Sequence, residues 1–227
     1  LQPYLQETDC TTFVETVLAL ARTAVKKQST WDEYCRQLTA LRYRNGKIDG
    51  YLSRLHYFSD WIANNEQKGF VTDITKISGG VPDTLQLYFM SRNADRYPAL
   101  QRNATLVDDI AVQERSLSGK IIYYLPTFRL DSASLATIQS GDIIAFTTDI
   151  PGLDIAHVGI AIQNNGEVRL IHASSSQGRV IVENRSILQQ LKDNKKFSGI
   201  RIIRKKISRA GNNRIVHIFR IFFLQHH

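Results

Sequence analysis

The stretch Asp9-Cys10-Thr11-Thr12-Phe13-Val14-Glu15 places a cysteine at the start of a helix that we predict over residues 8–27. Thr8 or Asp9 can cap this helix, because each has a side-chain oxygen that can accept a hydrogen bond from the first turn. Apolar residues then recur at helical spacing: Phe13, Val14, Val17, Leu18 and Ala21. The sequence therefore puts a thiol at a helix N-terminus.

A helix N-terminus is a favourable position for a reactive cysteine. Its free N–H groups and partial positive charge favour a thiolate, which lowers the cysteine pKa. The same N–H groups can bind the oxyanion that forms when a carbonyl is attacked. Cys10 is therefore a candidate nucleophile, although a buried structural role is the common alternative for a single cysteine. We expect Cys35, in the middle of a helix, to pack, and a disulfide to Cys10 is the alternative.

Beyond the first helix, the chain changes from helices to strands, which predicts an α+β fold. Residues 31–41 and 53–65 have helical spacing, and residues 66–80 indicate a strand and a glycine-rich turn. We expect one domain over residues 1–205, with a helical insertion at about 42–117 and a tail without assigned role at 206–227. An antiparallel sheet is predicted from short apolar runs between turns, at 121–124, 143–146, 157–162, 168–172, 180–182 and 199–203.

Composition narrows the class of protein. The chain has 227 residues, of which 43% are hydrophobic and 22% charged, as is usual for a globular domain. No run reaches the roughly 18–20 apolar residues of a membrane span, so we expect no integral membrane segment. The net charge of +8 attracts polyanions. We nevertheless expect no nucleic-acid partner, because there is no zinc-finger or RNA-binding signature and the only dense basic cluster is Arg201, Arg204, Lys205, Lys206 and Arg209.

Two histidines lie on neighbouring predicted strands. His157 begins the apolar run His157-Val158-Gly159-Ile160, and His172 lies in Leu170-Ile171-His172-Ala173. A neutral imidazole suits a base that activates a thiol. Adjacent antiparallel strands would bring the two rings together, so that His172 orients His157 as the third member of a triad. Gln163 or Asn164 are weaker candidates for that role, and an isolated histidine is more often structural.

The same residues could bind zinc, because cysteine and histidine are its usual ligands. Structural zinc needs four protein ligands, and the sequence lacks the close Cys or His pairs that normally supply them. We therefore expect neither a metal nor another cofactor at Cys10, His157 and His172.

Four motifs in order resemble the NlpC-type papain-like cysteine peptidases, a superfamily of bacterial cell-wall hydrolases. They are Asp9-Cys10-Thr11-Thr12-Phe13, Gly141-Asp142-Ile143-Ile144, His157-Val158-Gly159-Ile160 and Ile171-His172-Ala173-Ser174. Within the superfamily the chain is most similar to the N-acetylmuramoyl-L-alanine amidase-like branch. That similarity rests on the segments 9–15, 42–46, 53–61 and 152–157, and the resemblance covers about residues 5–204.

The resemblance implies a papain-like core, in which an N-terminal catalytic helix packs on an antiparallel sheet. It implies Cys10 as nucleophile, His157 as base and His172 as the orienting residue. It also implies a bacterial envelope enzyme, periplasmic, secreted or a lipoprotein, that hydrolyses the muramoyl–L-alanine amide bond of peptidoglycan or muropeptides. The rival specificity is the bond after D-glutamate. We expect a monomer. Because the first residues have neither a basic nor an apolar signal region, we expect that a signal peptide is either absent or already removed.

Six residues are candidates for substrate binding. Asp9 and Thr11 flank the nucleophile, although Asp9 also suits a helix cap. Arg54, His56 and Tyr57 lie in the predicted insertion, where surface packing is an equally good explanation. Tyr4 would replace an aromatic residue that lines the site in the family, where more chain precedes the nucleophile. The pair Thr11-Thr12 departs from the family's Ser-Gly and would alter the floor of the cleft.

Other functions use the same residues. A transferase or deamidase on this scaffold would have the same triad, and only its products would distinguish it. A non-catalytic cell-wall-binding module is a third possibility, but binding alone requires no thiol. The combination of Cys10, His157 and His172 therefore favours a hydrolase.

Overall fold

The computed structural model describes residues 3, 7–27, 29–164 and 166–206. The predicted tail, beyond Lys206, and Tyr4 lie outside these residues. The α helices are α1 Cys10–Ala24, α2 Trp31–Arg42, α3 Phe58–Gln67, α4 Phe89–Arg92, α5 Ala104–Leu117, α6 Ser132–Ala136 and α7 Ile187–Asp193. The strands are β1 Val71–Asp73, β2 Val81–Thr84, β3 Ile121–Pro126, β4 Ile143–Thr148, β5 Ile155–Asn164, β6 Glu167–Ser174, β7 Arg179–Val182 and β8 Phe197–Lys205.

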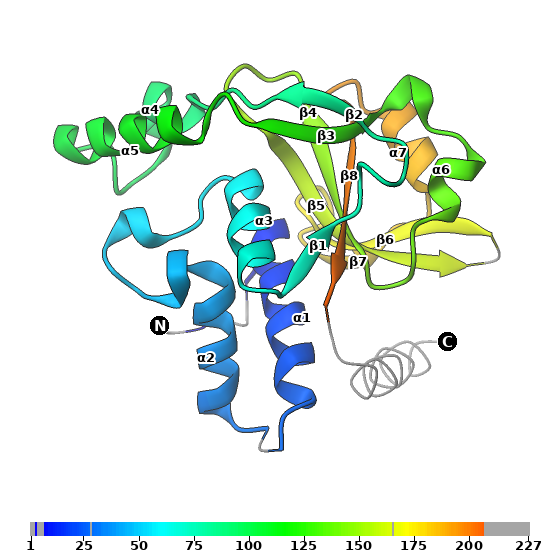
Figure 1. Cartoon of the computed structure of the whole chain (residues 1–227), viewed down its shortest axis with the longest axis horizontal. Helices are drawn as coiled ribbons and strands as arrows, with labels where there is room; N and C mark the ends of the chain where they lie inside the picture. Colours follow the sequence, from blue (N-terminus) through cyan, green and yellow to red (C-terminus); the bar gives the residue numbers. More distant parts are fainter. Residues whose placement is uncertain (1–2, 4–6, 28, 165, 207–227) are drawn as a thin grey trace.

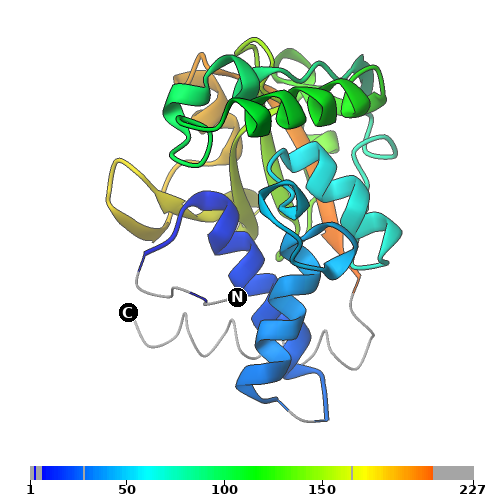
Figure 2. The same cartoon turned by 90° about the vertical axis from the view of Figure 1, so that its left-hand side faces the viewer.

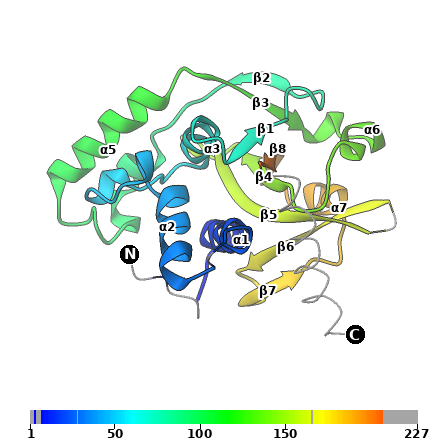
Figure 3. The ribbon, with the colours of Figure 1, turned by 60° about the horizontal axis from the view of Figure 1, so that its bottom comes forward.

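The strands form one eight-stranded sheet, which confirms the predicted α+β class with a large antiparallel sheet. Its order is β2-β3-β8-β4-β5-β6-β7, β1 also pairs with β8, and every pair is antiparallel. The sheet curves strongly around the axis of α1 (Figure 3). Its central strands, β4, β5 and β8, are therefore covered on both faces.

Alternate residues of the central strands face two different layers, as the two-residue period of a strand requires. One face packs on α1, α2 and α3, and this core includes Val14, Leu38, Trp61, Val158 and Ile160. The other face packs on α7, through Phe146, Ala161, Leu170, Ile187 and Leu191. Figure 1 shows α1 and α2 side by side below the sheet, with α7 on the opposite side of it.

A third cluster lies under α4 and α5. It includes Tyr57, Leu87, Met90, Ile110 and Leu117. Figure 2 shows these two helices together at the end of the molecule toward which the N-terminus of α1 points. The segment 42–117 therefore contributes a wall beside the first residue of α1.

The structure corrects our description of residues 42–117 in two ways. β1 lies within the strand and turn predicted at residues 66–80, whereas β2, at Val81–Thr84, is a strand that our description of the segment did not include. The helix predicted at 53–65 begins instead at Phe58, after a 3-10 turn at Tyr51–Ser53. A distant residue determines this start: the carboxylate of Asp154 accepts a hydrogen bond from the Ser59 N–H at 2.6 Å, in the position of a helix cap.

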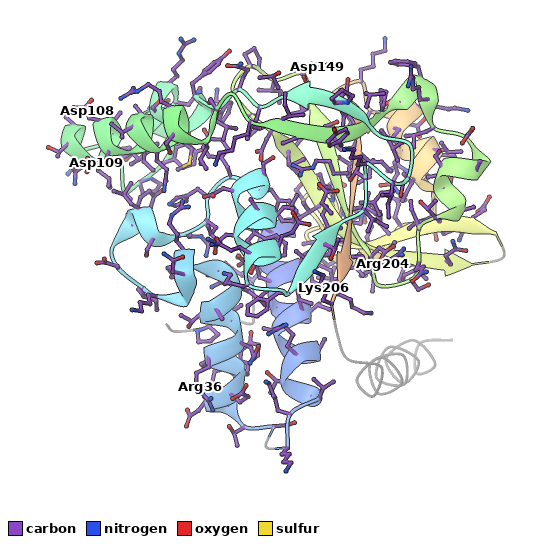
Figure 4. The ribbon with its side chains drawn as sticks, viewed as in Figure 1. Arg36, Asp108, Asp109, Asp149, Arg204 and Lys206 are labelled. Atoms are coloured by element: carbon purple, nitrogen blue, oxygen red, sulfur yellow. The ribbon has the colours of Figure 1, made fainter. Side chains whose placement is uncertain are left out.

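Two arginines of the dense basic cluster near the end of the chain are paired with acidic residues of the fold. Arg201 is only 4% exposed and donates hydrogen bonds to Asp73 and Ser59. Arg204 donates to both oxygens of Asp142, at 3.0 and 2.7 Å. Figure 4 shows Arg204 and Lys206 near the end of β8. These arginines pair with carboxylates of the fold, whereas a basic patch for nucleic acid needs free charges.

Over the described ranges, no helix combines the length and the apolar character needed to cross a membrane.

Candidate active site

Helix α1 begins at Cys10 because Asp9 and Thr12 form a reciprocal cap. The Asp9 carboxylate accepts from the Thr12 N–H at 2.7 Å, and the Asp9 N–H donates to the Thr12 hydroxyl at 2.9 Å. This is the capping-box arrangement, with threonine at the third helical position. Thr12, at the position where the family motif has glycine, therefore supplies half of the cap.

The cap leaves two N–H groups free at the nucleophile. Thr12 N–H bonds to the Asp9 carboxylate, and Phe13 N–H bonds to the Asp9 carbonyl at 2.9 Å. Among the described residues, no oxygen acceptor is found for the N–H groups of Cys10 and Thr11, and the Thr11 N–H is directed at the Cys10 sulfur. Unpaired donors at a helix start are suited to binding an oxyanion.

The environment of the Cys10 thiol differs from our expectation. Burial raises the pKa of Cys10, and the carboxylate of Asp9 raises it further. The N–H groups of Val158 and Thr11 and the Thr11 side chain oppose this rise, but they do not reverse it. The prediction that the helix N-terminus lowers the pKa of this thiol is wrong, because desolvation outweighs the helix-start donors.

His157 and His172 form a hydrogen-bonded pair on β5 and β6. His157 Nε2 lies 2.7 Å from His172 Nδ1, and the two rings meet edge to face at 86°. The pairing of Ile160 with Ile171 sets this register. Burial lowers the pKa of His157 to about 4, and the neighbouring His172 lowers it as well. His157 is therefore a neutral imidazole near pH 7.

Cys10 and His157 line one cleft of about 130 Å³. Over the residues that the structure describes, no hydrogen bond joins the thiol to His157. The Nε2 atom of His157 is engaged with His172, so Nδ1 of His157 remains available to the thiol. A larger hollow of about 580 Å³ runs along β7, and neither Cys10 nor His157 lines it. We assign the site to the smaller cleft because the thiol and the imidazole meet there.

The predicted substrate-binding residues lie at different places. Thr11, His56 and Tyr57 line the cleft with Cys10. Asp9 acts as the helix cap. Arg54 does not line the cleft, and its guanidinium lies 3.7 Å from the carboxylate of Glu15.

Two of these residues have polar groups that are already engaged. His56 Nε2 lies 3.0 Å from the Tyr51 carbonyl oxygen, and burial lowers the pKa of His56 to about 4. The Tyr57 hydroxyl donates to Glu114 at 2.6 Å and accepts from the Met90 N–H at 2.9 Å. Burial and the Glu114 carboxylate raise the pKa of Tyr57. Both rings therefore serve as cleft walls, with their polar atoms turned to the protein.

Sequence reasoning missed several residues of the site. Met90, Tyr97, Leu153 and Asp154 also line the cleft. Asp154 is buried, which raises its pKa, and the N–H of Ser59 stabilises its charged form. A signal for Asp154 was present, because it lies three residues before His157 in the segment 152–157. Met90 and Tyr97 gave no comparable signal, since they come from a loop-rich segment far from the motifs.

Glu15 is a further residue that the sequence analysis did not single out, and it lies on the buried face of α1. It is fully buried, accepts from Arg42 Nε at 2.7 Å, and has Arg54 at 3.7 Å. A glutamate within the apolar stripe of the first helix was the available signal. Its ion pairs fix the segment that leads to His56 and Tyr57 against the helix of the nucleophile.

The two cysteines are not joined by a disulfide. Cys10 and Cys35 are both free thiols, and Cys35 packs against the core between the helices and the sheet. Within the described part of the chain, no three histidine, cysteine or carboxylate side chains are arranged to hold a metal ion.

Comparison with known proteins gives one family and several similar structures. Residues 1–200 match the AmiA-like family, described as N-acetylmuramoyl-L-alanine amidase-like. A structure of an N-acetylmuramoyl-L-alanine amidase from Bacteroides uniformis is 41% identical, with a TM-score of 0.86, over 91% of this chain and 88% of that one. A candidate xylanase from Bacteroides fragilis is 43% identical, with a TM-score of 0.84, over 90% and 89%.

A more distant structure shares the fold alone. It is a protein from Legionella pneumophila of the family DUF1460, with 22% identity and a TM-score of 0.65, over 88% of this chain and 76% of that one. No curated protein matches the chain.

Proposed function

The chain belongs to the N-acetylmuramoyl-L-alanine amidase-like family, and from this premise we propose that it is a cysteine-dependent amidase of bacterial peptidoglycan. The bond cleaved is the amide between the muramoyl lactyl group and L-alanine, the bond that the name of the Bacteroides uniformis relative specifies. One observation carries the proposal: Cys10, at the capped start of α1, lines the same cleft as His157, which is paired with His172. The same arrangement supports a papain-like interpretation of the fold.

The reaction begins from a neutral pair. The thiol of Cys10 and the imidazole of His157 are both uncharged near pH 7, because burial opposes ionisation of each. His157 Nδ1 takes the thiol proton as sulfur attacks the amide carbonyl carbon. N–H groups at the start of α1, including that of Cys10, which has no acceptor within the described residues, bind the resulting oxyanion.

The same imidazole completes the reaction. Protonated His157 gives its proton to the nitrogen of L-alanine, the carbon–nitrogen bond breaks, and the stem peptide leaves as an amine. The muramoyl acyl group remains on Cys10 as a thioester. Water, deprotonated by His157, then hydrolyses the thioester and restores the thiol. His172 keeps the His157 ring in position throughout, through the 2.7 Å contact.

Glycoside hydrolysis, suggested by the name of the Bacteroides fragilis relative, suits this cleft less well. Most glycosidases use two carboxyl groups on opposite sides of the scissile bond, roughly 5–9.5 Å apart. Asp154 supplies the one carboxylate among the lining residues, and it is occupied by the Ser59 N–H at 2.6 Å. A thiol and an imidazole are instead the groups of acyl transfer.

The proposed substrate also indicates where in the cell the enzyme acts. Peptidoglycan lies in the bacterial envelope, so we propose that the enzyme acts there, as a monomer.

Digestion of purified muropeptides tests the proposal. The wild type should release free stem peptide that begins at L-alanine, identified by mass spectrometry, and Cys10→Ala should release none. Cys35→Ala is the matched control, because Cys35 is also a free thiol but packs in the core, and it should retain activity. A cut after D-glutamate would overturn the proposed bond, and activity in Cys10→Ala would overturn the proposed nucleophile.

A further inference from the structure

We propose that Glu183 is a positioning residue, whose carboxylate fixes the proton on His172 and, through it, the proton on His157. This inference rests on the proposed function, since it concerns the same site. It extends the pair of histidines to a chain of four groups: Cys10, His157, His172 and Glu183.

The order of protons along the chain follows from the ring atoms. A neutral imidazole has one N–H and one bare nitrogen. If His157 is to accept the thiol proton at Nδ1, then its own N–H lies at Nε2. That N–H points to His172 Nδ1 at 2.7 Å, so His172 Nδ1 must be the bare nitrogen. His172 must therefore carry its proton at Nε2.

His172 Nε2 is the atom that needs an acceptor. His172 is only 7% exposed, and its Nε2 is buried without a hydrogen-bond partner. A buried donor without an acceptor costs roughly 1–3 kcal/mol. Without an acceptor, His172 would prefer the other tautomer, with its proton at Nδ1. That proton and the proton on His157 Nε2 would then face each other and repel. The base would then be protonated at the wrong nitrogen.

Glu183 is the acceptor within reach. Its Oε2 lies 3.9 Å from His172 Nε2. This separation is longer than a hydrogen bond. Catalytic hydrogen bonds are often long in the free enzyme and shorten when substrate binds. Glu183 is brought here by the sheet: its N–H donates to the Leu170 carbonyl on β6 at 2.8 Å, two residues from His172.

Arg185 holds the Glu183 carboxylate in place. The guanidinium of Arg185 donates to Oε2 at 2.9 Å and to Oε1 at 3.3 Å, and its backbone N–H donates to Oε1 at 3.2 Å. Arg185 is itself 3.3 Å from Asp193 on α7. The charged and titratable groups that act on His172 are thus His157 on β5, and Glu183 and Arg185 after β7. The carboxylate is ionised and oriented before substrate arrives.

The carboxylate should affect the chemical step more than binding. When His157 becomes an imidazolium, positive charge spreads along the pair of rings, and a carboxylate at the far end stabilises it. Glu183 does not line the cleft of Cys10 and His157; it lies at the separate hollow along β7. Its loss should therefore lower kcat and leave KM unchanged.

Three variants test this in the muropeptide assay. Glu183→Gln should lower kcat about tenfold with KM unchanged, which is the usual size for loss of such a supporting contact. It should also move the acid limb of kcat/KM to lower pH, because His172 and His157 lose a charge that favours their protonated forms. Glu183→Asp should recover part of the loss. Glu167→Gln is the matched control, because Glu167 also pairs with an arginine on β6 but is 53% exposed, and it should behave as wild type.

A second measurement does not depend on activity. Nitrogen-15 spectra of the imidazole rings report which nitrogen carries the proton. In the wild type both His157 and His172 should be protonated at Nε2, and Glu183→Leu, which removes the acceptor, should shift His172 toward the Nδ1 tautomer. Unchanged tautomers in Glu183→Leu, or unchanged kcat in Glu183→Gln with an active wild type, would overturn the inference. An inactive wild type with the predicted tautomer shift would overturn the proposed function alone.

Discussion

At the scale of single residues, burial sets the resting state of the site. It raises the pKa of the Cys10 thiol and lowers the pKa of His157 to about 4. The two groups are therefore neutral partners near pH 7, and not a thiolate–imidazolium pair. The helix start does not create a thiolate in advance; its N–H groups instead remain available for the charge that develops on the substrate oxygen.

This neutral state predicts how Cys10 reacts with iodoacetamide. The thiolate is the reactive form, so the rate should keep rising above pH 9, the ordinary thiol pKa. The chain has two cysteines, so the measurement uses the Cys35→Ser variant, in which Cys10 is the remaining thiol. An alkylation rate that is already at its plateau below pH 7 would indicate an ion pair and contradict this account.

A second residue-scale prediction concerns His56 and acid stability. The pKa of His56 is about 4 in the folded protein and about 6.5 when unfolded. Between these values the unfolded state binds more protons, so His56 reduces stability as pH falls from 6.5 to 4. The contribution is at most about 3 kcal/mol.

Urea unfolding at several pH values measures this. His56→Gln cannot protonate in this range, so it should lose less stability than wild type between pH 7 and pH 4. The two proteins must be compared because Glu15 and Asp154, whose pKa values are raised in the folded state, increase stability as the pH falls and partly mask the loss due to His56. Equal losses in the two proteins would show that His56 protonates as readily in the folded state.

At the scale of elements, the start of α1 and the wall beside it determine the site. The capping box of Asp9 and Thr12 defines Cys10 as the first helical residue. The buried carboxylate of Glu114, on α5, accepts from Tyr57 and from the N–H groups of Met90 and Ser91 on α4. These contacts join α4 and α5 to the segment that precedes α3.

The cap makes Thr12 a stabilising residue. Thr12→Ala removes the hydroxyl that accepts from the Asp9 N–H, and it should cost about 0.5–1 kcal/mol of unfolding free energy. Thr16→Ala, further along the same helix, is the control and should cost nothing, because alanine is the better helix former. Denaturant unfolding measures both. An equal effect of the two substitutions would show that the cap hydroxyl does not contribute.

A different prediction concerns Tyr57, in the wall formed by residues 42–117. Tyr57→Phe keeps the ring that lines the cleft but removes the hydroxyl that bonds to Glu114. Stability should fall by about 1–3 kcal/mol, because Glu114 remains buried with a lost donor, and KM for muropeptides should not change. Unfolding and steady-state kinetics are the two measurements. A raised KM with unchanged stability would mean that the hydroxyl contacts substrate.

At the scale of the whole molecule, the sheet could be predicted from the sequence because its central strands are short apolar runs between turns. Gly141 and Gly178, both at positive φ, lie in the turns that precede two of these runs, β4 and β7. β2 could not be predicted, because Val81-Pro82-Asp83-Thr84 is a short edge strand without apolar alternation. The start of α3 was also out of reach, since it depends on Asp154, 95 residues away from Ser59.

The candidate site was predictable to a similar extent. The sequence pointed to Cys10, His157 and His172 because each has a local signal, a helix start or a strand. It gave the wrong direction for the thiol pKa, because burial is a property of the assembled fold. It also gave no indication of Glu183, whose proximity to His172 arises from the pairing of β6 with β7.

Trapping the covalent intermediate tests the central claim most directly. Wild-type protein is mixed with muropeptide, quenched in acid within one turnover, and analysed by intact-mass and peptide-mapping mass spectrometry. The account predicts a thioester on Cys10 whose added mass is that of the muramoyl sugar, and no adduct on Cys10→Ala. A stem-peptide adduct on Cys10 would contradict the proposed bond, and cleavage by Cys10→Ala would contradict the cysteine mechanism.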